Sequence, residues 1–282
     1  MHIICDWELH DIANKFSYYY EYRSFTEFYV LSDILKDYSN NNLFLFLIID
    51  STNKYLIDHI VNLKSGDVCI AEYQSQGMGR LGRKWISFLG GNLYFSIYWH
   101  MVKRKVFNTI FSPMVAVVVA ETLKILGVRM VRIKWPNDIY LNNRKLAGIL
   151  VEIKNKINDD FLHLIIGIGI NLSSFHMSAH YSNMVYKNSW ASLQEFDIYI
   201  NRNLLIFELI SVLHDTLRKF EHGDFRSFVM RWSLFDNFYN KKIKLLVNNK
   251  ILQGINRGIN RQGALLLERS GRVYSYLNAN IF

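Results

Sequence analysis

The sequence predicts an α+β fold, in which helices cover one face of a sheet built largely from hairpin-linked strands. Three observations support this prediction. Leu43–Ile49 reads LFLFLII, a short, apolar and aromatic-rich run that is typical of a buried strand. Ile139–Leu141 and Lys145–Ile153 flank an Asn-Asn pair, as the two strands of a β-hairpin do. Between Tyr55 and Leu63, apolar side chains recur at helical spacing.

The remaining elements follow from local start and stop signals. Asp50–Asn53 reads DSTN, four residues that favour helix starts, so a helix should follow the first strand and end at Lys64–Asp67. Pro113 and Gly127 bound a second helix over Met114–Leu126. We expect further strands over Val68–Tyr73, Asn92–Trp99, Arg132–Trp135 and Phe161–Leu172, a turn at Asn158–Asp160, and helices over Leu204–His222 and Asp224–Trp232.

Three segments of unequal size are expected. Residues 1–42 show no clean period and no glycine, so a separate helix-turn-helix module is not expected there. Residues 43–239 form the large α+β domain. From about Lys241, glycines recur at turn spacing among short apolar runs, which predicts a small β-barrel over residues 240–282.

Composition narrows the class of protein. Of the 282 residues, 50% are hydrophobic and 15% aromatic, as in a globular chain that can bury a core. The net charge of +9 suits anionic substrates or nucleic acid, although the basic residues are spread along the chain. Cys5 and Cys69 form no disulfide framework or metal-ligand spacing. We find no signal peptide and no consecutive apolar run of membrane-spanning length, so a cytoplasmic protein that does not enter a membrane is expected.

The stretch Gln74–Trp85, QSQGMGRLGRKW, is the strongest candidate for a functional loop. It interleaves glycines with basic residues: Gly77, Gly79, Gly82, Arg80, Arg83 and Lys84. Glycine permits close backbone approach, and arginine offers a planar fork of donors to carboxylate or phosphate. The stretch therefore predicts a mobile loop that closes around an anion; a solvated turn is the alternative. It is not a dinucleotide-binding fingerprint, because a strand and not a helix follows it.

Several motifs, in order, resemble those of biotin–protein ligases. They are GMGRLGRKW (Gly77–Trp85), KWPNDIYL (Lys134–Leu141), KLAGILVE (Lys145–Glu152), GIGIN (Gly167–Asn171), DSTN (Asp50–Asn53) and QGALLLE (Gln262–Glu268). The resemblance covers about residues 43–270. It implies a mixed-sheet catalytic domain like that of class II aminoacyl-tRNA synthetases and biotin ligases, followed by an SH3-like β-barrel.

The resemblance also implies a reaction. Biotin and ATP, with Mg²⁺ carried mainly by the phosphates, would give biotinyl-5′-adenylate and pyrophosphate. A lysine of the biotin carboxyl carrier protein of acetyl-CoA carboxylase would then take the biotinyl group. A carboxylate attacking a triphosphate brings two anions together, so positioned cations are needed. The adenylate must also be shielded from water, which a closing loop can do.

Site residues carried over from the resemblance form three sets. Arg80 and Lys134 are the expected catalytic cations, and Asp138 is expected to orient the acceptor lysine. The expected biotin contacts are Ser51, Thr52, Asn53, Gln74, Gly77, Met78, Arg80, Lys134, Gly148, Gly167 and Gly169. The expected ATP and adenylate contacts are Arg80, Arg83, Lys84, Trp85, Lys134, Asn137, Lys145, Asn171 and Trp190. No metal ligand is assigned.

Structural roles compete with these assignments. Ser51–Asn53 can cap a helix while contacting a ligand. The glycines of the Phe161–Leu172 strand can mark bulges instead of close approach. Asp138 can form an Asx turn after proline, and Lys145 can be an ordinary hairpin charge. Trp190 can stack on adenine or belong to the core.

The chain departs from the family pattern at two places, and other readings remain open. Met78 replaces the first arginine of the usual GRGRxGRxW loop, which predicts looser ligand retention. Tyr276–Phe282 replaces the usual acidic, glycine-containing ending. About forty residues precede the catalytic region, fewer than a winged helix-turn-helix needs, so DNA binding is not expected. The alternatives are a bifunctional ligase and biotin-operon repressor, or a lipoate ligase. A homodimer through Lys145–Ile153 as an edge strand is also possible on this sequence.

Overall fold

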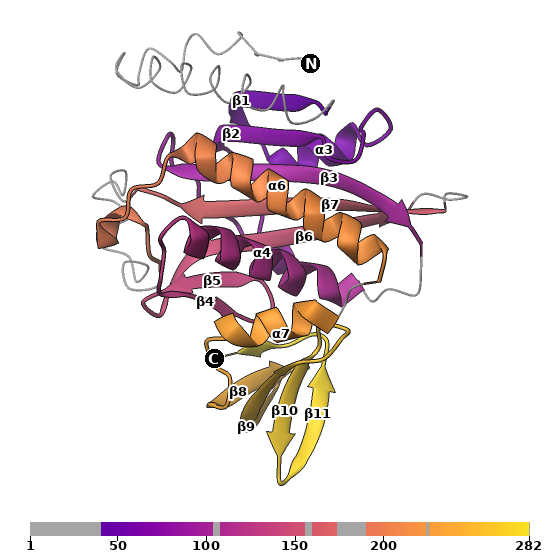
Figure 1. Ribbon diagram of the computed structural model, residues 1–282, viewed down its shortest axis with the longest axis vertical. Helices are drawn as coiled ribbons and strands as arrows, with labels where there is room; N and C mark the ends of the chain where they lie inside the picture. Colours follow the sequence, from indigo (N-terminus) through magenta and orange to yellow (C-terminus); the bar gives the residue numbers. More distant parts are fainter. Residues whose placement is uncertain (1–40, 104–107, 156–159, 174–189, 224–225, 282) are drawn as a thin grey trace.

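A seven-stranded sheet forms the centre of the computed structural model, which describes residues 41–103, 108–155, 160–173, 190–223 and 226–281 (Figure 1). The strand order is β1-β2-β3-β7-β6-β5-β4. The strands are β1 (Leu43–Ile49), β2 (Val68–Gln74), β3 (Asn92–Val102), β4 (Val131–Lys134), β5 (Asp138–Leu141), β6 (Arg144–Asn155) and β7 (Phe161–Asn171). β1 and β2 are parallel and the other neighbours antiparallel, so the sheet is mixed. This confirms the predicted α+β class.

Helices cover both faces of this sheet, which corrects the expectation of a single helical face. α4 (Phe111–Ile125), α6 (Arg202–Glu221) and α7 (Arg226–Phe235) lie on one side (Figure 1). α3 (Thr52–Asp58) packs on the other. The reason is visible in β1, where successive side chains point to opposite faces. Leu43 and Leu45 join the core beneath α4 and α6, whereas Phe44 and Phe46 join a smaller cluster around Leu56 of α3.

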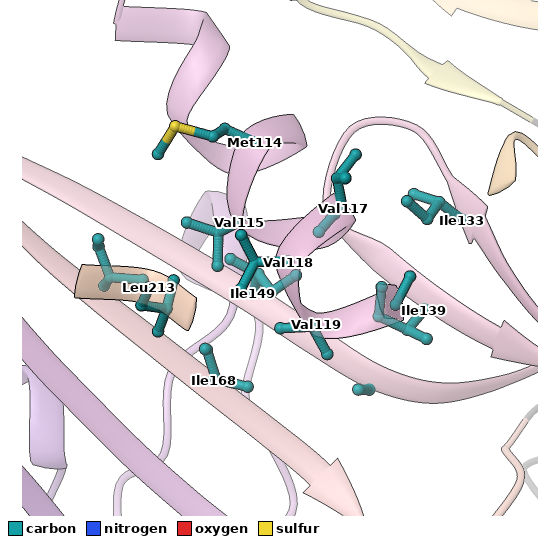
Figure 2. Close-up of a cluster of buried hydrophobic side chains, with 14 of the residues drawn as sticks. Met114, Val115, Val117, Val118, Val119, Ile133, Ile139, Ile149, Ile168 and Leu213 are labelled. Atoms are coloured by element: carbon teal, nitrogen blue, oxygen red, sulfur yellow. The ribbon is translucent and has the colours of Figure 1, made fainter. Parts of the chain in front are cut away.

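The larger core is centred on α4. Val115, Val118 and Val119 lie with Ile149 of β6 and Ile168 of β7, all fully or almost fully buried (Figure 2). The segment Asn108–Ile125 is long and apolar enough to cross a membrane, which counting consecutive apolar residues did not detect. Of its most apolar window, 67% is buried inside the molecule, as is typical of a core helix.

α3 is shorter than predicted. It ends at Asp58, with His59 as its C-cap, and does not continue to Lys64. Tighter turns follow, in which Ile60 N–H donates to Ile57 O and Asn62 N–H to His59 O. The Asp67 carboxylate then accepts the N–H groups of Lys64 and Asn42, which fixes the chain before β2. The buried Asp67 therefore determines where the segment leading into β2 turns.

A second, five-stranded sheet lies at the C-terminal end. Its order is β11-β10-β9-β8-β12, and all its neighbours are antiparallel. The strands are β8 (Lys242–Val247), β9 (Lys250–Ile259), β10 (Leu265–Arg269), β11 (Arg272–Tyr276) and β12 (Asn280–Ile281). The predicted strands are therefore present. The domain boundary near Asn240 stays a prediction, and the predictions for residues 1–40, for most of the Asn158–Asp160 turn and for a helix start at Asp224 lie outside the described residues.

β6 is not the simple edge strand that we expected. Its first half pairs with β5, through Arg144 to Gly148, and its other side pairs with β7. β5 is only four residues long, so it cannot cover the full length of β6. Over Leu150–Asn155, β7 is the only strand neighbour within the described residues. The expected free edge is therefore restricted to the second half of the strand.

A buried ion pair joins the start of α6 to the sheet. Arg202 Nη1 lies 2.6 and 2.7 Å from the carboxylate oxygens of Glu72, whose exposed fraction is 1%. Glu72 lies in β2, directly before the glycine-rich loop. Removing one partner of such a pair leaves a charge without compensation in a site that excludes water.

We predict that Arg202→Met lowers the free energy of unfolding by about 3 to 5 kcal/mol, because it leaves the Glu72 carboxylate buried and unpaired. Replacing both Glu72 and Arg202 by Met should restore most of this loss. Urea unfolding of the single and double variants measures the change in the free energy of unfolding. The control is Lys54→Ala, which breaks an ion pair of the same 2.6 Å length at the surface and should leave stability nearly unchanged. An Arg202→Met variant as stable as wild type would contradict the prediction.

Candidate functional site

The glycine-rich loop is folded as a small flap. Trp85 N–H donates to Gly77 O at 2.8 Å, Gly79 N–H donates to Arg83 O at 2.6 Å, and Met78 forms an antiparallel bridge with Lys84. A single 3₁₀ turn, Arg80–Gly82, forms the tip. Leu81 and Gly82 have φ values of 57° and 71°, so the tip needs the left-handed backbone that glycine adopts readily.

A cavity lies between the flap and the sheet face that carries α3. Its walls come from the start of α3, the end of β2, the flap, β3, the β4–β5 turn, β6 and β7. Twelve of the expected site residues line it: Ser51, Thr52, Asn53, Gln74, Met78, Arg80, Trp85, Asn137, Lys145, Gly148, Gly167 and Gly169. Residues from separate segments of the chain are therefore brought to one place.

One end of the cavity is a hydrogen-bonding network of uncharged side chains, supported by the Glu152 carboxylate outside the cavity wall. Gln74 Oε1 accepts the backbone N–H of Thr52 at 2.9 Å and lies 3.1 Å from its hydroxyl. The Ser96 hydroxyl lies 2.6 Å from Thr52 Oγ1 and 2.7 Å from Asn53 Oδ1. Asn53 Nδ2 donates to Glu152 Oε2 at 2.9 Å. Ser51 caps α3 by accepting from Lys54 N–H, so the cap role and the position at the cavity coexist.

Sequence reasoning missed Ser96 and Glu152 as parts of this network. Ser96 is fully buried on β3, and it is the one polar residue within the run LYFSIYW, which was a usable signal. Glu152 ends the KLAGILVE motif on β6. Neither could be placed opposite Asn53 without knowing that β3, β7 and β6 are neighbours.

The sheet glycines at the cavity are sites of close approach. A Cβ on Gly167 would lie 2.3 Å from Asn53 Oδ1, and a Cβ on Gly148 or Gly169 would lie 2.7 Å from the Trp85 ring. The β6–β7 register is unbroken from Ala147↔Ile170 to Asn155↔Leu162. The alternative of bulges at Gly167 and Gly169 is therefore wrong.

Trp85 forms the roof of the cavity. Its indole rests on Gly148 and Gly169, and Lys145 Nζ lies 5.3 Å from its ring centroid. The buried indole N–H has no hydrogen-bond partner within the described residues. A buried donor without a partner costs free energy, and a ligand with an acceptor atom there would remove that cost.

The opposite end of the cavity is cationic. Asn137 Nδ2 donates to Ile149 O at 2.8 Å, which turns its Oδ1 toward Arg80 Nη1 at 3.2 Å. Lys145 Nζ lies 2.8 Å from Asp138 Oδ1. Lys134 lies opposite Asp138 in the register of the β4–β5 hairpin. Its side chain extends over the Tyr140 ring, with 5.6 Å from Nζ to the ring centroid.

These charges perturb one another. Burial lowers the pKa of the Lys134 ammonium; Asp138 opposes this effect, and Lys145 and Arg83 add to it. Burial also lowers the pKa of Arg80, with Asp138 raising it and Arg83 lowering it. Burial and then Asp138 raise the pKa of Tyr140 to about 12. The arrangement places several partly desolvated cations around one carboxylate, which is an electrostatic environment suited to a polyanion.

The other expected site residues lie outside the cavity wall. Lys134 and Asp138 lie beside it on the β4–β5 hairpin, while Gly77, Arg83 and Lys84 belong to the body of the flap. Asn171 donates to Ala191 O at 3.1 Å, and Trp190 forms a parallel bridge with Lys145. Trp190 therefore lies beside Lys145 of the cavity wall, and Asn171 contacts Ala191, the residue after Trp190.

The described residues offer no group of three or more His, Cys, Asp or Glu side chains that could hold a metal ion. Asp138, the carboxylate nearest the cations, is already paired with Lys145. Within the described part of the chain, its own donors therefore do not form a resident Mg²⁺ site.

Fold and site together define a class of protein, the ligases of the biotin/lipoate A/B protein ligase family, whose model matches residues 45–171. Within it, the bifunctional ligase/repressor BirA of Escherichia coli is 43% identical over 248 residues, covering 88% of this chain and 76% of its own. The biotin–[acetyl-CoA-carboxylase] ligase of Mycobacterium tuberculosis is 30% identical over 122 residues, which cover 38% of this chain and 40% of that protein. The chain belongs to the biotin–protein ligase family.

A solved structure gives the same assignment. The biotin protein ligase from Aquifex aeolicus in complex with biotin and ATP superposes with a TM-score of 0.70 at 26% identity, covering 86% of this chain and 98% of that chain.

We predict that Asp138→Asn shifts the titration of Lys134 to lower pH, because it removes the charge that raises the Lys134 pKa. Lys145→Met should shift the titration to higher pH by removing a like charge. NMR of ¹³C-methylated lysines measures both. Lys54, which pairs with Asp58 on α3, should titrate as in wild type in both variants. Shifts in the same direction in the two variants would contradict the proposed charge arrangement.

Proposed function

We propose that the chain is an ATP-dependent ligase that activates biotin to biotinyl-5′-adenylate and transfers it to a lysine of a biotin carboxyl carrier protein. The observation that supports this most directly is the polarity of the cavity. Its neutral network at Thr52, Asn53 and Ser96 suits an uncharged ureido ring, and its cationic end at Arg80 suits a carboxylate meeting a phosphate.

In the first step, a biotin carboxylate oxygen attacks the α-phosphorus of ATP. The bond from that phosphorus to the bridging oxygen breaks, and pyrophosphate leaves. Arg80 holds the carboxylate at the phosphate, and Lys134 and Lys145 balance the negative charge that accumulates in the transition state. Mg²⁺ enters as part of the ATP substrate, held by its phosphates. Asn171 and Trp190 receive the adenine side of the adenylate.

In the second step, the acceptor lysine attacks the acyl carbon of the mixed anhydride. An amide bond forms, the bond to the phosphate oxygen breaks, AMP leaves, and the attacking nitrogen gives up a proton. Asp138 orients the incoming lysine, which attacks as the neutral amine. Between the two steps the flap shields the anhydride from water, with Trp85 closing the roof and Arg80 binding the phosphate. Met78, which is 54% exposed on the flap, supplies no charged donor there.

Further parts of the assignment are proposals of the same kind. The C-terminal sheet is proposed to be an SH3-like barrel, and residues 1–42, 43–239 and 240–282 to be separate units. Leu150–Asn155 is a candidate edge for antiparallel pairing in a homodimer. We propose a cytoplasmic enzyme that does not bind DNA.

The function is tested by incubating a carrier domain with the chain, ATP and Mg²⁺, with either biotin or lipoate, followed by mass spectrometry of the carrier. We expect the carrier mass to increase by one biotinyl group with biotin and to stay unchanged with lipoate. A carrier in which the acceptor lysine is replaced by arginine is the control. A lipoyl adduct would favour a lipoate ligase, and no adduct with either acid would refute the proposal.

We predict that Arg80→Ala slows adenylate formation about a hundredfold, because it removes a donor from charge that develops in the transition state. Folding should persist, since the Arg80 side chain lies on the flap. Pyrophosphate release measures the first step, and free biotinyl adenylate in solution measures early loss of the intermediate. Lys54→Ala, which removes an exposed cation of α3 outside the cavity wall, is the control. Wild-type rates for Arg80→Ala in both assays would rule out this role.

A further inference from the structure

The strand that carries Lys134 is held from the C-terminal side of the chain. β4 is four residues long and ends the seven-stranded sheet, with β5 on one side. On its other side runs the backbone that leads from α7 into β8. Asn237 N–H donates to Ile133 O at 2.9 Å, and Asp236 forms a parallel bridge with Ile133. The edge of β4 is therefore covered at the residue before Lys134.

A buried carboxylate stabilises that covering segment. Asp236 accepts from Asn256 Nδ2 at 2.9 and 3.1 Å, and from Phe238 N–H at 2.9 Å. Trp232 Nε1–H donates to it at 3.2 Å. Asn256 lies on β9 and Trp232 on α7, so the segment beside β4 is fixed to both the last helix and the C-terminal sheet.

A second connection starts at the residue after Lys134. The Trp135 indole N–H donates to Gly263 O at 2.9 Å, in the turn between β9 and β10, and Trp135 is 3% exposed. The Thr109 hydroxyl donates to Gln262 O of the same turn at 2.8 Å. Gly263 has φ +75°, and a Cβ there would lie 2.8 Å from Ile110 Cα. Only glycine lets the turn approach so closely.

We propose that Trp135 is a positioning residue for Lys134, through which the C-terminal turn at Gly263 holds the Lys134 ammonium in place for the adenylation step. The inference rests on the proposed function, in which Lys134 is a catalytic cation. Lys134 is the last residue of β4, and Trp135 begins the turn that leads to β5. With its indole fixed in the core by Gly263, Trp135 fixes the backbone from which Lys134 extends to the site face.

This connection matters because Lys134 is held among like charges. The groups that face it are Asp138 of β5, Lys145 of β6, Arg83 of the flap and the Tyr140 ring. Two of the three charged neighbours repel it, and its own burial lowers its pKa. If the backbone loosens, the ammonium moves toward water, and its pKa rises toward the ordinary value of lysine. A loosened Lys134 therefore stays protonated to higher pH while being less well placed.

The test is Trp135→Phe, which keeps an aromatic ring in the core, removes the donor to Gly263 O and makes the buried side chain smaller. Pyrophosphate release is measured over a range of pH, together with KM for biotin. We expect kcat to fall about tenfold because a catalytic group is misplaced, with KM for biotin unchanged because Lys134 does not line the cavity. The alkaline limb of kcat/KM for ATP should move to higher pH. Trp99→Phe is the matched control, since it removes an indole donor of the same 2.9 Å length, to Glu221 on α6.

The outcomes are distinct. A Trp135→Phe enzyme with wild-type kcat, or with a reduced kcat and an unmoved alkaline limb as in any general loss of stability, overturns the inference. If Trp135→Phe does not fold, Thr109→Val weakens the same turn and should shift the limb in the same direction by a smaller amount; an unchanged limb there overturns it too. A wild-type chain that releases no pyrophosphate would instead refute the proposed function.

Discussion

Mutual repulsion among cations is the constraint on which the site depends. Arg80, Arg83, Lys134 and Lys145 lie close enough for their charges to act on one another, with Asp138 as the opposing carboxylate. Partly desolvated like charges remain together only where each is separately held. Asn137 holds Arg80, Asp138 and the Trp85 ring hold Lys145, and the Tyr140 ring faces Lys134. The site is thus assembled before any anion arrives.

The sheet supplies that assembly through simple alternation. On β4, β5 and β6, the side chains on one face of the sheet enter the core with α4. The side chains on the other face include the cations Lys134 and Lys145. Ile133, Ile139 and Ile149 lie in the core, next in sequence to Lys134, Asp138 and Gly148 (Figure 2). Because core packing is dense and intolerant of shifts, apolar residues fix the positions of the charges that follow or precede them. The flap, by contrast, is fixed by its own short hydrogen bonds, by the packing of Trp85 and by the hydrogen bond from Arg80 to Asn137.

Local signals were enough for most elements, and nonlocal pairing explains the failures. The Asn142-Asn143 turn was predicted from residue type, and both residues have the positive φ that such a turn requires, 49° and 60°. The place of α3 could not be predicted, because Phe44 and Leu43 are equally apolar although they face different cores. β6 was taken for an edge because the expected hairpin with β5 accounts for one side of the strand, and the pairing of its other side with β7 was not anticipated. Trp85 and Lys145 were expected at the site, but their contact depends on a fold in which flap and sheet meet.

The packing of the Trp85 indole on two glycines has a consequence for which ligands can enter. With no Cβ at Gly148 or Gly169, the ring occupies space in which a Cβ would lie 2.7 Å from it, and both glycines and the ring line the cavity. Selectivity against bulkier analogues of the ligand therefore depends on the absence of side chains at Gly148 and Gly169 as much as on the presence of the Trp85 ring. To admit an enlarged biotin analogue, Trp85 would be replaced by a smaller residue, because Gly148 and Gly169 have no side chain that could be shortened.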